Sequence, residues 1–107
     1  MKALIFSLTT VLGLFLATPA FANLDLAKKN NCMSCHAIDK KIVGPAYHDV
    51  AKKYAGDKNA VAMLAQRIKG GTAANGGQKW GVIPMPPNNV SEADAQTLAK
   101  WILDGAK

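Results

Sequence analysis

The chain has 107 residues, half of them hydrophobic, and a formal net charge of +6 at neutral pH. A chain this short is expected to form one domain. Its basic residues are spread along the sequence, with no clustered arm of the kind that binds nucleic acid. The positive charge suits either ordinary solubility or attraction to acidic partners.

The first 22 residues are predicted to be a cleaved signal peptide. Lys2 is their only charged residue, an apolar run follows it, and Ala20-Phe21-Ala22 has the small-x-small pattern of a signal-peptidase site. A lone transmembrane anchor is the alternative, but the run is short and a cleavage pattern follows it. Removing 22 of the 107 residues leaves 85 and lowers the formal charge from +6 to +5, since only Lys2 is lost. We expect residues 23–107 to form a single domain exported to the periplasm.

Two short helices are predicted at the start of the mature chain. Residues 23–31 form the first, with Asn23 as its N-cap. Residues 46–55 form the second, which stops at Gly56. Helices of this length are marginal alone in water and need packing partners.

A third helix is predicted over residues 58–69, with Asp57 as its N-cap. Its apolar residues recur at i, i+3, i+4 and i+7, and Gly70-Gly71 ends the pattern. The following segment, residues 70–81, is rich in glycine and small polar residues and is predicted to be a loop.

The last helix is predicted to follow an extended Pro-rich segment, residues 82–90. Ser91 is its expected N-cap, with Asp94 three residues later as a weak capping box, and Gly105 ends it. No stretch alternates apolar and polar residues well enough to be a strand. We therefore expect an all-α fold whose alanine-rich helices make a thin core, which something else must fill.

The motif that can fill the core is Cys32-Met33-Ser34-Cys35-His36, which holds the only two cysteines of the chain. On a helical turn, positions i, i+3 and i+4 share a face, so both thiols and the imidazole point the same way. C-x-x-C-H is the signature of covalent c-type haem attachment, with His36 as the proximal ligand to iron.

Three other readings of this motif are weaker. A thioredoxin-like redox pair needs a βαβ context, which is missing from the predicted elements. Zinc would need two more ligands, and His48 is the only other histidine. A structural disulfide is possible in an exported protein, but it leaves His36 without a role.

Met85 is the expected sixth ligand of the iron. Pro84, Pro86 and Pro87 surround it and stiffen its backbone, which limits the entropy lost when a weak thioether bond forms. His48, Met63 and an open sixth position are the alternatives. Met63 lies beside the apolar stripe of a helix, and His48 is expected to be exposed. Met33 lies between the two cysteines, on the wrong side of the iron.

A histidine and methionine pair would fill both axial positions and raise the reduction potential above that of a bis-histidine site. No substrate could then reach the iron without breaking a bond. This arrangement suits an electron carrier, and we expect no enzymatic activity. The alternative of a haem enzyme or gas sensor requires an open or labile sixth site, and that of a subunit of a larger assembly requires a stable partner.

The mature chain resembles the small bacterial class I cytochromes c of the cytochrome c-551 type. The resemblance spans its whole length and is most specific in Ile83–Asn88. The other matching stretches are Cys32–His36, Val43–Tyr47, Trp80-Gly81 and Leu98–Leu103. It implies four to five short helices wrapped around one covalently attached haem c.

The resemblance also implies a role for each site residue. Cys32 and Cys35 would form thioethers to the haem, and His36 and Met85 would be the axial ligands. The Pro45 carbonyl would accept the other ring N–H of His36. Arg67 and the indole N–H of Trp80 would donate hydrogen bonds to a haem propionate, and Asn88 would form a hydrogen bond near the Met85 sulfur. Arg67 could instead be a solvated helix residue, and Trp80 could serve only packing. Trp101 is expected to be structural and to pack the last helix on the first.

Two departures from the family are visible. The segment 72–79 is a few residues longer than usual before the Trp-Gly pair, which puts the propionate contact of Trp80 in doubt. Ala27 stands where some members have phenylalanine, which suggests closer helix pairing near Trp101.

The expected function is that of a periplasmic, monomeric, single-haem carrier that shuttles one electron between respiratory complexes and terminal reductases or oxidases. The resemblance suggests nitrite reductase, a terminal oxidase or cytochrome c peroxidase as acidic partners that dock transiently, and no membrane insertion after cleavage. The docking surface is expected to be an apolar ring at the haem edge bordered by lysines among Lys28, Lys29, Lys40, Lys41, Lys52, Lys53 and Lys79.

Overall fold

A computed structural model describes residues 20–107 of the chain. Its elements are α1 (Ala20–Lys29), the 3₁₀ turn η1 (Cys32–Ser34), α2 (Tyr47–Lys53), α3 (Ala60–Ala74) and α4 (Glu92–Leu103). Within this range there is no strand, only an isolated bridge between His36 and Lys41. The predicted all-α class is confirmed.

Most of the predicted signal peptide, residues 1–19, lies outside the described residues, so its cleavage stays a prediction. Over residues 20–107, no helix is long and apolar enough to cross a membrane.

The first helix begins earlier than predicted. α1 starts at Ala20, so Asn23 lies inside the helix and is not its N-cap. An N-cap stands before the first turn, whereas here the residues upstream of Asn23 continue the helix. α1 ends at Lys29, and Asn31, with a left-handed φ of 60°, turns the chain into η1.

The second and third helices are also shifted from their predicted bounds. α2 begins after the extended residue Ala46 and ends at Lys53, short of the predicted stop at Gly56. Asp57 does not cap α3: its carboxylate accepts the N–H of Asn59 at 2.8 Å, which closes a turn before the helix begins at Ala60. An aspartate readily makes this local turn in place of a cap.

α3 continues past the predicted glycine stop. Gly71 has a φ of 70° and a ψ of −171°, which kinks the helix, but one more helical turn follows and reaches Ala74. Asn75 closes this turn, because its N–H donates to the Thr72 carbonyl and its side-chain amide donates to the Gly71 carbonyl. The prediction of a loop over 70–81 is therefore wrong for its first five residues.

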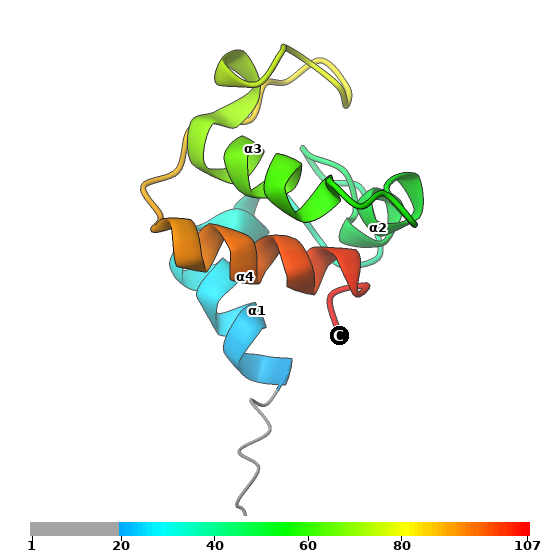
Figure 1. The fold of residues 1–107 in the computed structure, drawn as a ribbon, viewed down its shortest axis with the longest axis vertical. Helices are drawn as coiled ribbons and strands as arrows, with labels where there is room; N and C mark the ends of the chain where they lie inside the picture. The colour runs from blue at the N-terminus through cyan, green and yellow to red at the C-terminus, as the bar shows by residue number, and fades with distance from the viewer. Residues whose placement is uncertain (1–19) are drawn as a thin grey trace, which may run out of the picture.

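α4 forms as predicted and holds the fold together. The Ser91 hydroxyl accepts the N–H of Asp94 at 3.1 Å, which confirms Ser91 as the N-cap, and Gly105 adopts a positive φ just past the helix end. α4 packs against α1, α2 and α3, as Figure 1 shows. Leu98 of α4 is 1% exposed and is the largest fully buried side chain of the described chain.

Trp101 of α4 contacts α2 and the C-terminal residue in addition to sharing a buried cluster with α1. It belongs to the same buried cluster as Ala27 of α1, which is fully buried. Its ring meets the Tyr47 ring of α2 edge to face at 5.5 Å, and its indole N–H donates to the Lys107 carbonyl at 3.2 Å. Trp101 therefore links α4 to α2 and to Lys107, in the buried cluster that also holds Ala27 of α1.

Candidate functional site

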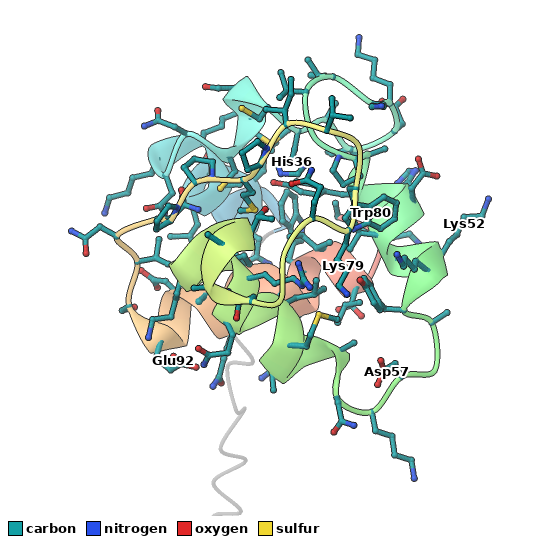
Figure 2. The ribbon with its side chains drawn as sticks, turned by 90° about the horizontal axis from the view of Figure 1, so that it is seen from above. His36, Lys52, Asp57, Lys79, Trp80 and Glu92 are labelled. Atoms are coloured by element: carbon teal, nitrogen blue, oxygen red, sulfur yellow. The ribbon has the colours of Figure 1, made fainter. Side chains whose placement is uncertain are left out.

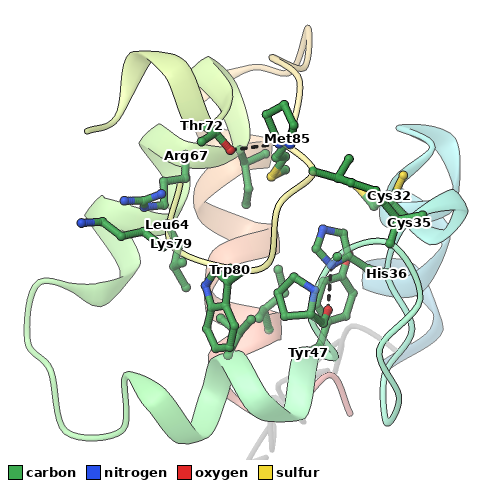
Figure 3. A pocket seen from close by; sticks show the side chains of 18 of the residues that line it. Cys32, Cys35, His36, Tyr47, Leu64, Arg67, Thr72, Lys79, Trp80 and Met85 are labelled. Atoms are coloured by element: carbon green, nitrogen blue, oxygen red, sulfur yellow. Dashed lines mark hydrogen bonds between the residues drawn. The ribbon is translucent and has the colours of Figure 1, made fainter. Parts of the chain in front are cut away.

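A cavity of about 300 Å³ is lined by η1 and the segment that follows it, by α2, α3 and α4, and by the segment that joins α3 to α4. Figure 2 looks down on the segment between α3 and α4 and labels two of its residues, Lys79 and Trp80, together with His36. Most of the lining is apolar. The cavity brings together all but one of the predicted haem-site residues, as Figure 3 shows for most of them: Cys32, Cys35, His36, Pro45, Arg67, Trp80 and Met85.

The imidazole of His36 is held by the segment that follows it. Nδ1 lies 2.8 Å from the Pro45 carbonyl oxygen, which can only accept a hydrogen bond, so Nδ1 carries the proton. The other nitrogen, Nε2, then has a lone pair available for a metal. Gly44 lies against the ring, because a Cβ there would be 2.5 Å from Cε1, and no side chain fits at this position.

The two cysteines lie beside His36, in and just after η1. Both thiols are free and half-buried, and both line the cavity. Burial raises the pKa of the Cys32 thiol above its ordinary value. The Gly44 N–H donates to the Cys35 carbonyl at 2.8 Å and folds the segment that holds His36 against the cysteines. Two thiols and one imidazole are thus gathered at one end of the cavity.

Met85 lines the cavity from the segment between α3 and α4. Its N–H donates to the Thr72 hydroxyl at 2.9 Å, and its carbonyl accepts the Thr72 N–H at 3.0 Å. The sequence did not point to Thr72, because the two residues are 13 positions apart and no local pattern links them.

The other candidate ligands lie away from the cavity. His48 is exposed, and its Nε2 is 3.0 Å from the Gly105 carbonyl oxygen. Met33 and Met63 pack against the core and do not line the cavity. Among residues 20–107, no group of three or more His, Cys, Asp or Glu side chains is placed to hold a metal ion.

Arg67 reaches the cavity from α3 with a buried donor that has no partner among the described residues. Its Nη2 donates to the Asn75 carbonyl at 3.0 Å, and its Nε is buried without a hydrogen-bond partner among the described residues. A buried guanidinium N–H needs an acceptor, and a carboxylate is its usual one. The Trp80 ring also lines the cavity, and the Lys53 ammonium lies 4.5 Å from the centre of this ring.

Asn88 is not part of the cavity lining. Its side-chain amide donates to the Ile68 carbonyl at 2.8 Å, and its backbone N–H donates to the Lys69 carbonyl at 3.1 Å. These bonds anchor the end of the Pro-rich segment on α3. The predicted bond of Asn88 near the Met85 sulfur stays a prediction.

Comparison with known proteins decides the family. The cytochrome c family model matches residues 25–106. The chain belongs to the cytochrome c family. It is 55% identical to cytochrome c-552 of Hydrogenobacter thermophilus over 98 residues, covering 92% of this chain and 94% of the relative. It is 60% identical to cytochrome c-551 of Pseudomonas aeruginosa over 78 residues, covering 73% and 71% of the two chains.

The fold of this cytochrome agrees with solved structures. The crystal structure of wild-type cytochrome c552 from Nitrosomonas europaea superposes with a TM-score of 0.70 at 56% identity, covering 76% of this chain and 96% of that one. The protein therefore has the class I cytochrome c fold. It is a small haem electron carrier of the c-551 type, and its cofactor is one haem c bound covalently through two thioethers.

The described residues fit that cofactor. Two free thiols and an imidazole with an open Nε2 stand together, the walls are apolar, and the unpartnered Nε of Arg67 calls for an anionic acceptor such as a propionate. Bound haem supplies a reversible one-electron exchange at its iron. The protein supplies attachment, orientation and the exclusion of water.

Proposed function

We propose that this cytochrome is a periplasmic carrier that shuttles one electron at a time between respiratory complexes and terminal reductases or oxidases. In this proposal Cys32 and Cys35 form the thioethers, and His36 and Met85 are the axial ligands. One observation carries the assignment above the others. The Pro45 carbonyl fixes the proton on Nδ1 of His36 and leaves Nε2, in a cavity that Met85 also lines, free for iron.

The restraints on the His36 ring and on the Met85 backbone favour a carrier over an enzyme. Pro45 and Gly44 restrict the His36 ring, while Thr72 and the flanking prolines restrict Met85. Ligands that keep their place in both oxidation states require little reorganisation when an electron arrives or leaves. An iron with both positions filled has no site for a substrate.

The polar residues of the site have supporting roles in the proposal. Arg67 and the indole N–H of Trp80 bond a propionate, and the unused Nε of Arg67 supports the first of these. Lys53 lies over the Trp80 ring, which supports a role for this lysine in keeping the indole at the cavity. Asn88 holds the end of the ligand segment on α3 and, in the proposal, bonds near the Met85 sulfur.

Exposed apolar residues in and next to the cavity lining form the proposed docking surface. Val82 is 92% exposed and Ile83 57%, while Ile42 and Val43 are 48% and 40% exposed; we call these four residues the apolar rim. Val43 and Ile83 line the cavity itself, together with Lys79. An apolar centre edged by positive charge fits an acidic redox protein that binds briefly, such as a nitrite reductase, a terminal oxidase or a cytochrome c peroxidase.

The periplasmic location in this proposal depends on the signal peptide predicted for residues 1–22. Haem c attachment to an exported chain is consistent with it. Mass determination of the protein from cells tests the point, because cleavage after Ala22 would leave a chain that begins at Asn23.

The experiment that tests the carrier function is the absorption spectrum of the ferric protein in the far red, where charge transfer between thioether and iron absorbs. We expect this band in the wild type, its loss in Met85→Ala, and its retention in Met63→Ala, which removes a methionine outside the cavity. A high-spin ferric spectrum without the band, together with rapid cyanide binding, would contradict the proposal and indicate an open iron.

A further inference from the structure

We propose that Thr72 is a positioning residue for the Met85 ligand, and that Gly71 and Thr72 together form a backbone socket for it. We call these two residues the Met85 socket. The inference rests on the proposed function, since it takes Met85 as the sixth ligand. It concerns how the protein keeps a weak thioether ligand on the iron.

The socket holds both polar groups of the Met85 backbone. The Thr72 hydroxyl accepts the Met85 N–H at 2.9 Å, and the Thr72 N–H donates to the Met85 carbonyl at 3.0 Å. Pro84, Pro86 and Pro87 have no N–H, so Met85 carries the only backbone donor of the stretch 84–87. The hydroxyl of Thr72 is therefore the partner of the single donor that this stretch can offer.

Gly71 makes the close contact possible. A Cβ on Gly71 would lie 2.5 Å from the Met85 carbonyl oxygen and 2.8 Å from the Pro86 carbonyl carbon. Its φ of 70° also belongs to the left-handed region that glycine tolerates best. The kink in α3 thus has a use: it brings the Met85 backbone against the helix and turns the next N–H, that of Thr72, to its carbonyl.

Because both the N–H and the carbonyl of Met85 are hydrogen-bonded, the direction of the Cα–Cβ bond of Met85 is fixed. Asn88 adds a second anchor, because it is bonded to the carbonyls of Ile68 and Lys69 one turn earlier on α3. A thioether carried on a backbone fixed in this way would stay near the iron and would be hard for another ligand to displace. Removal of the hydroxyl should leave the ligand in place but make it easier to displace.

The test uses ferric holoprotein and imidazole, a small neutral ligand that competes with Met85 for the iron. Thr72→Val removes the hydroxyl and keeps the shape of the side chain, while Thr72→Ser keeps the hydroxyl. Thr97→Val is the matched control, because it removes a hydroxyl that donates to the Ala93 carbonyl at 2.9 Å on the exposed face of α4. The far-red band reports the fraction of iron that still holds the thioether.

We expect Thr72→Val to bind imidazole about tenfold more tightly than the wild type, the ratio that corresponds to about 1.4 kcal/mol. Thr72→Ser and Thr97→Val should stay within about twofold of the wild type. If Thr72→Val and the wild type bind imidazole with equal affinity and both show the band, the positioning role of Thr72 is contradicted while the proposed ligation stands. Absence of the band from the wild type would overturn the proposed ligation, and the socket with it.

Discussion

The ring of Tyr47 lies stacked on the imidazole of His36, with the ring centroids 5.1 Å apart and an angle of 21° between the planes. Tyr47 is 3% exposed, and its ring also meets the Trp101 ring in an edge-to-face arrangement. Three groups therefore restrain the His36 ring: the stacked ring of Tyr47, the Cα of Gly44, which has no side chain, and the carbonyl of Pro45. One short stretch, Gly44–Tyr47, supplies all three restraints.

Loss of the Tyr47 ring should disturb the orientation of the His36 ligand. Tyr47→Leu removes aromatic contacts with His36 and Trp101, each worth about 0.5–1.5 kcal/mol, so we expect the free energy of unfolding to fall by about 1–3 kcal/mol. Tyr47→Phe keeps both contacts. In the ferric protein, proton NMR shifts of the haem methyl groups depend on the plane of the axial imidazole. These shifts should change in the leucine variant and stay close to wild type in the phenylalanine variant.

If Tyr47 had a purely structural role, Tyr47→Leu would lower the free energy of unfolding and leave the haem methyl shifts unchanged. Trp101→Phe is a useful comparison, because it alters the other aromatic contact of Tyr47 and leaves the stacking of Tyr47 on His36 in place. It should lower stability with little effect on the methyl shifts.

Burial of Tyr47 also predicts a dependence of stability on pH. Burial raises the pKa of its phenol well above the ordinary value of 10, and the effect of burial persists when Cys32 is a thioether and cannot ionise. The folded protein holds this proton more tightly than the unfolded chain does. The stabilisation is therefore complete below about pH 10 and is lost as the pH rises from there through the raised pKa.

The comparison of wild type with Tyr47→Phe isolates this proton. Above about pH 10, the unfolding free energy of the wild type should fall more steeply, by up to about 1.4 kcal/mol per pH unit. Denaturant titrations at several pH values measure the difference between the two slopes. Parallel curves for the two proteins would mean that the phenol ionises as freely in the folded state as in the unfolded one.

The sequence was most informative where chemistry and local structure coincide. The spacing in Cys32–His36 and the prolines around Met85 pointed to residues that the structure places at one cavity, because each pattern is contained in a few residues. Ser91 was found as an N-cap for the same reason, since a cap depends on the next three positions.

Contacts between distant segments could not be predicted in this way. Nothing near Thr72 indicates that its hydroxyl bonds to Met85. The pair Gly70-Gly71 predicts a helix end, as such pairs usually do, but Gly71 only kinks α3. The cap predicted at Asn23 fails because the residues before it also form helix, and the cap predicted at Asp57 fails because its carboxylate closes a turn.

Neutralisation of Arg67 tests the proposed propionate contact. Arg67→Gln removes a positive charge that disfavours the ferric state, so the reduction potential should fall, by up to roughly 60 mV, the equivalent of a tenfold change for one electron. It also removes a charge that favours an ionised propionate, so the pKa of the propionate should rise. The potential of the variant should then decrease with pH over a range where the wild type is flat.

Arg67→Lys is the control for charge, since lysine keeps the charge and lacks the planar fork of arginine. It should restore most of the potential. A glutamine variant with wild-type potential and pH dependence would place Arg67 among ordinary solvated helix residues.

The docking surface predicts an effect of charge that depends on position. Lys79 lines the haem-site cavity, whereas Lys58 lies in the exposed turn before α3 and is not part of that lining. Reversal of either charge changes the net charge of the protein equally. At an ionic strength of about 0.01 M, we expect Lys79→Glu to slow electron transfer to an acidic reductase by about tenfold and Lys58→Glu by no more than about twofold.

Salt distinguishes docking from a direct effect on the haem. Near 1 M salt the Debye length is about 3 Å, so the rates of Lys79→Glu and the wild type should converge. Val82→Ser should also slow electron transfer, but with a different dependence on salt. It removes apolar surface from the rim and leaves the charge unchanged, so its slower rate should persist at every salt concentration. Stopped-flow measurements with the same acidic reductase give all of these rates. Equal slowing by Lys79→Glu and Lys58→Glu would mean that the partner responds only to net charge, and that the rim around Val82 is not where it docks.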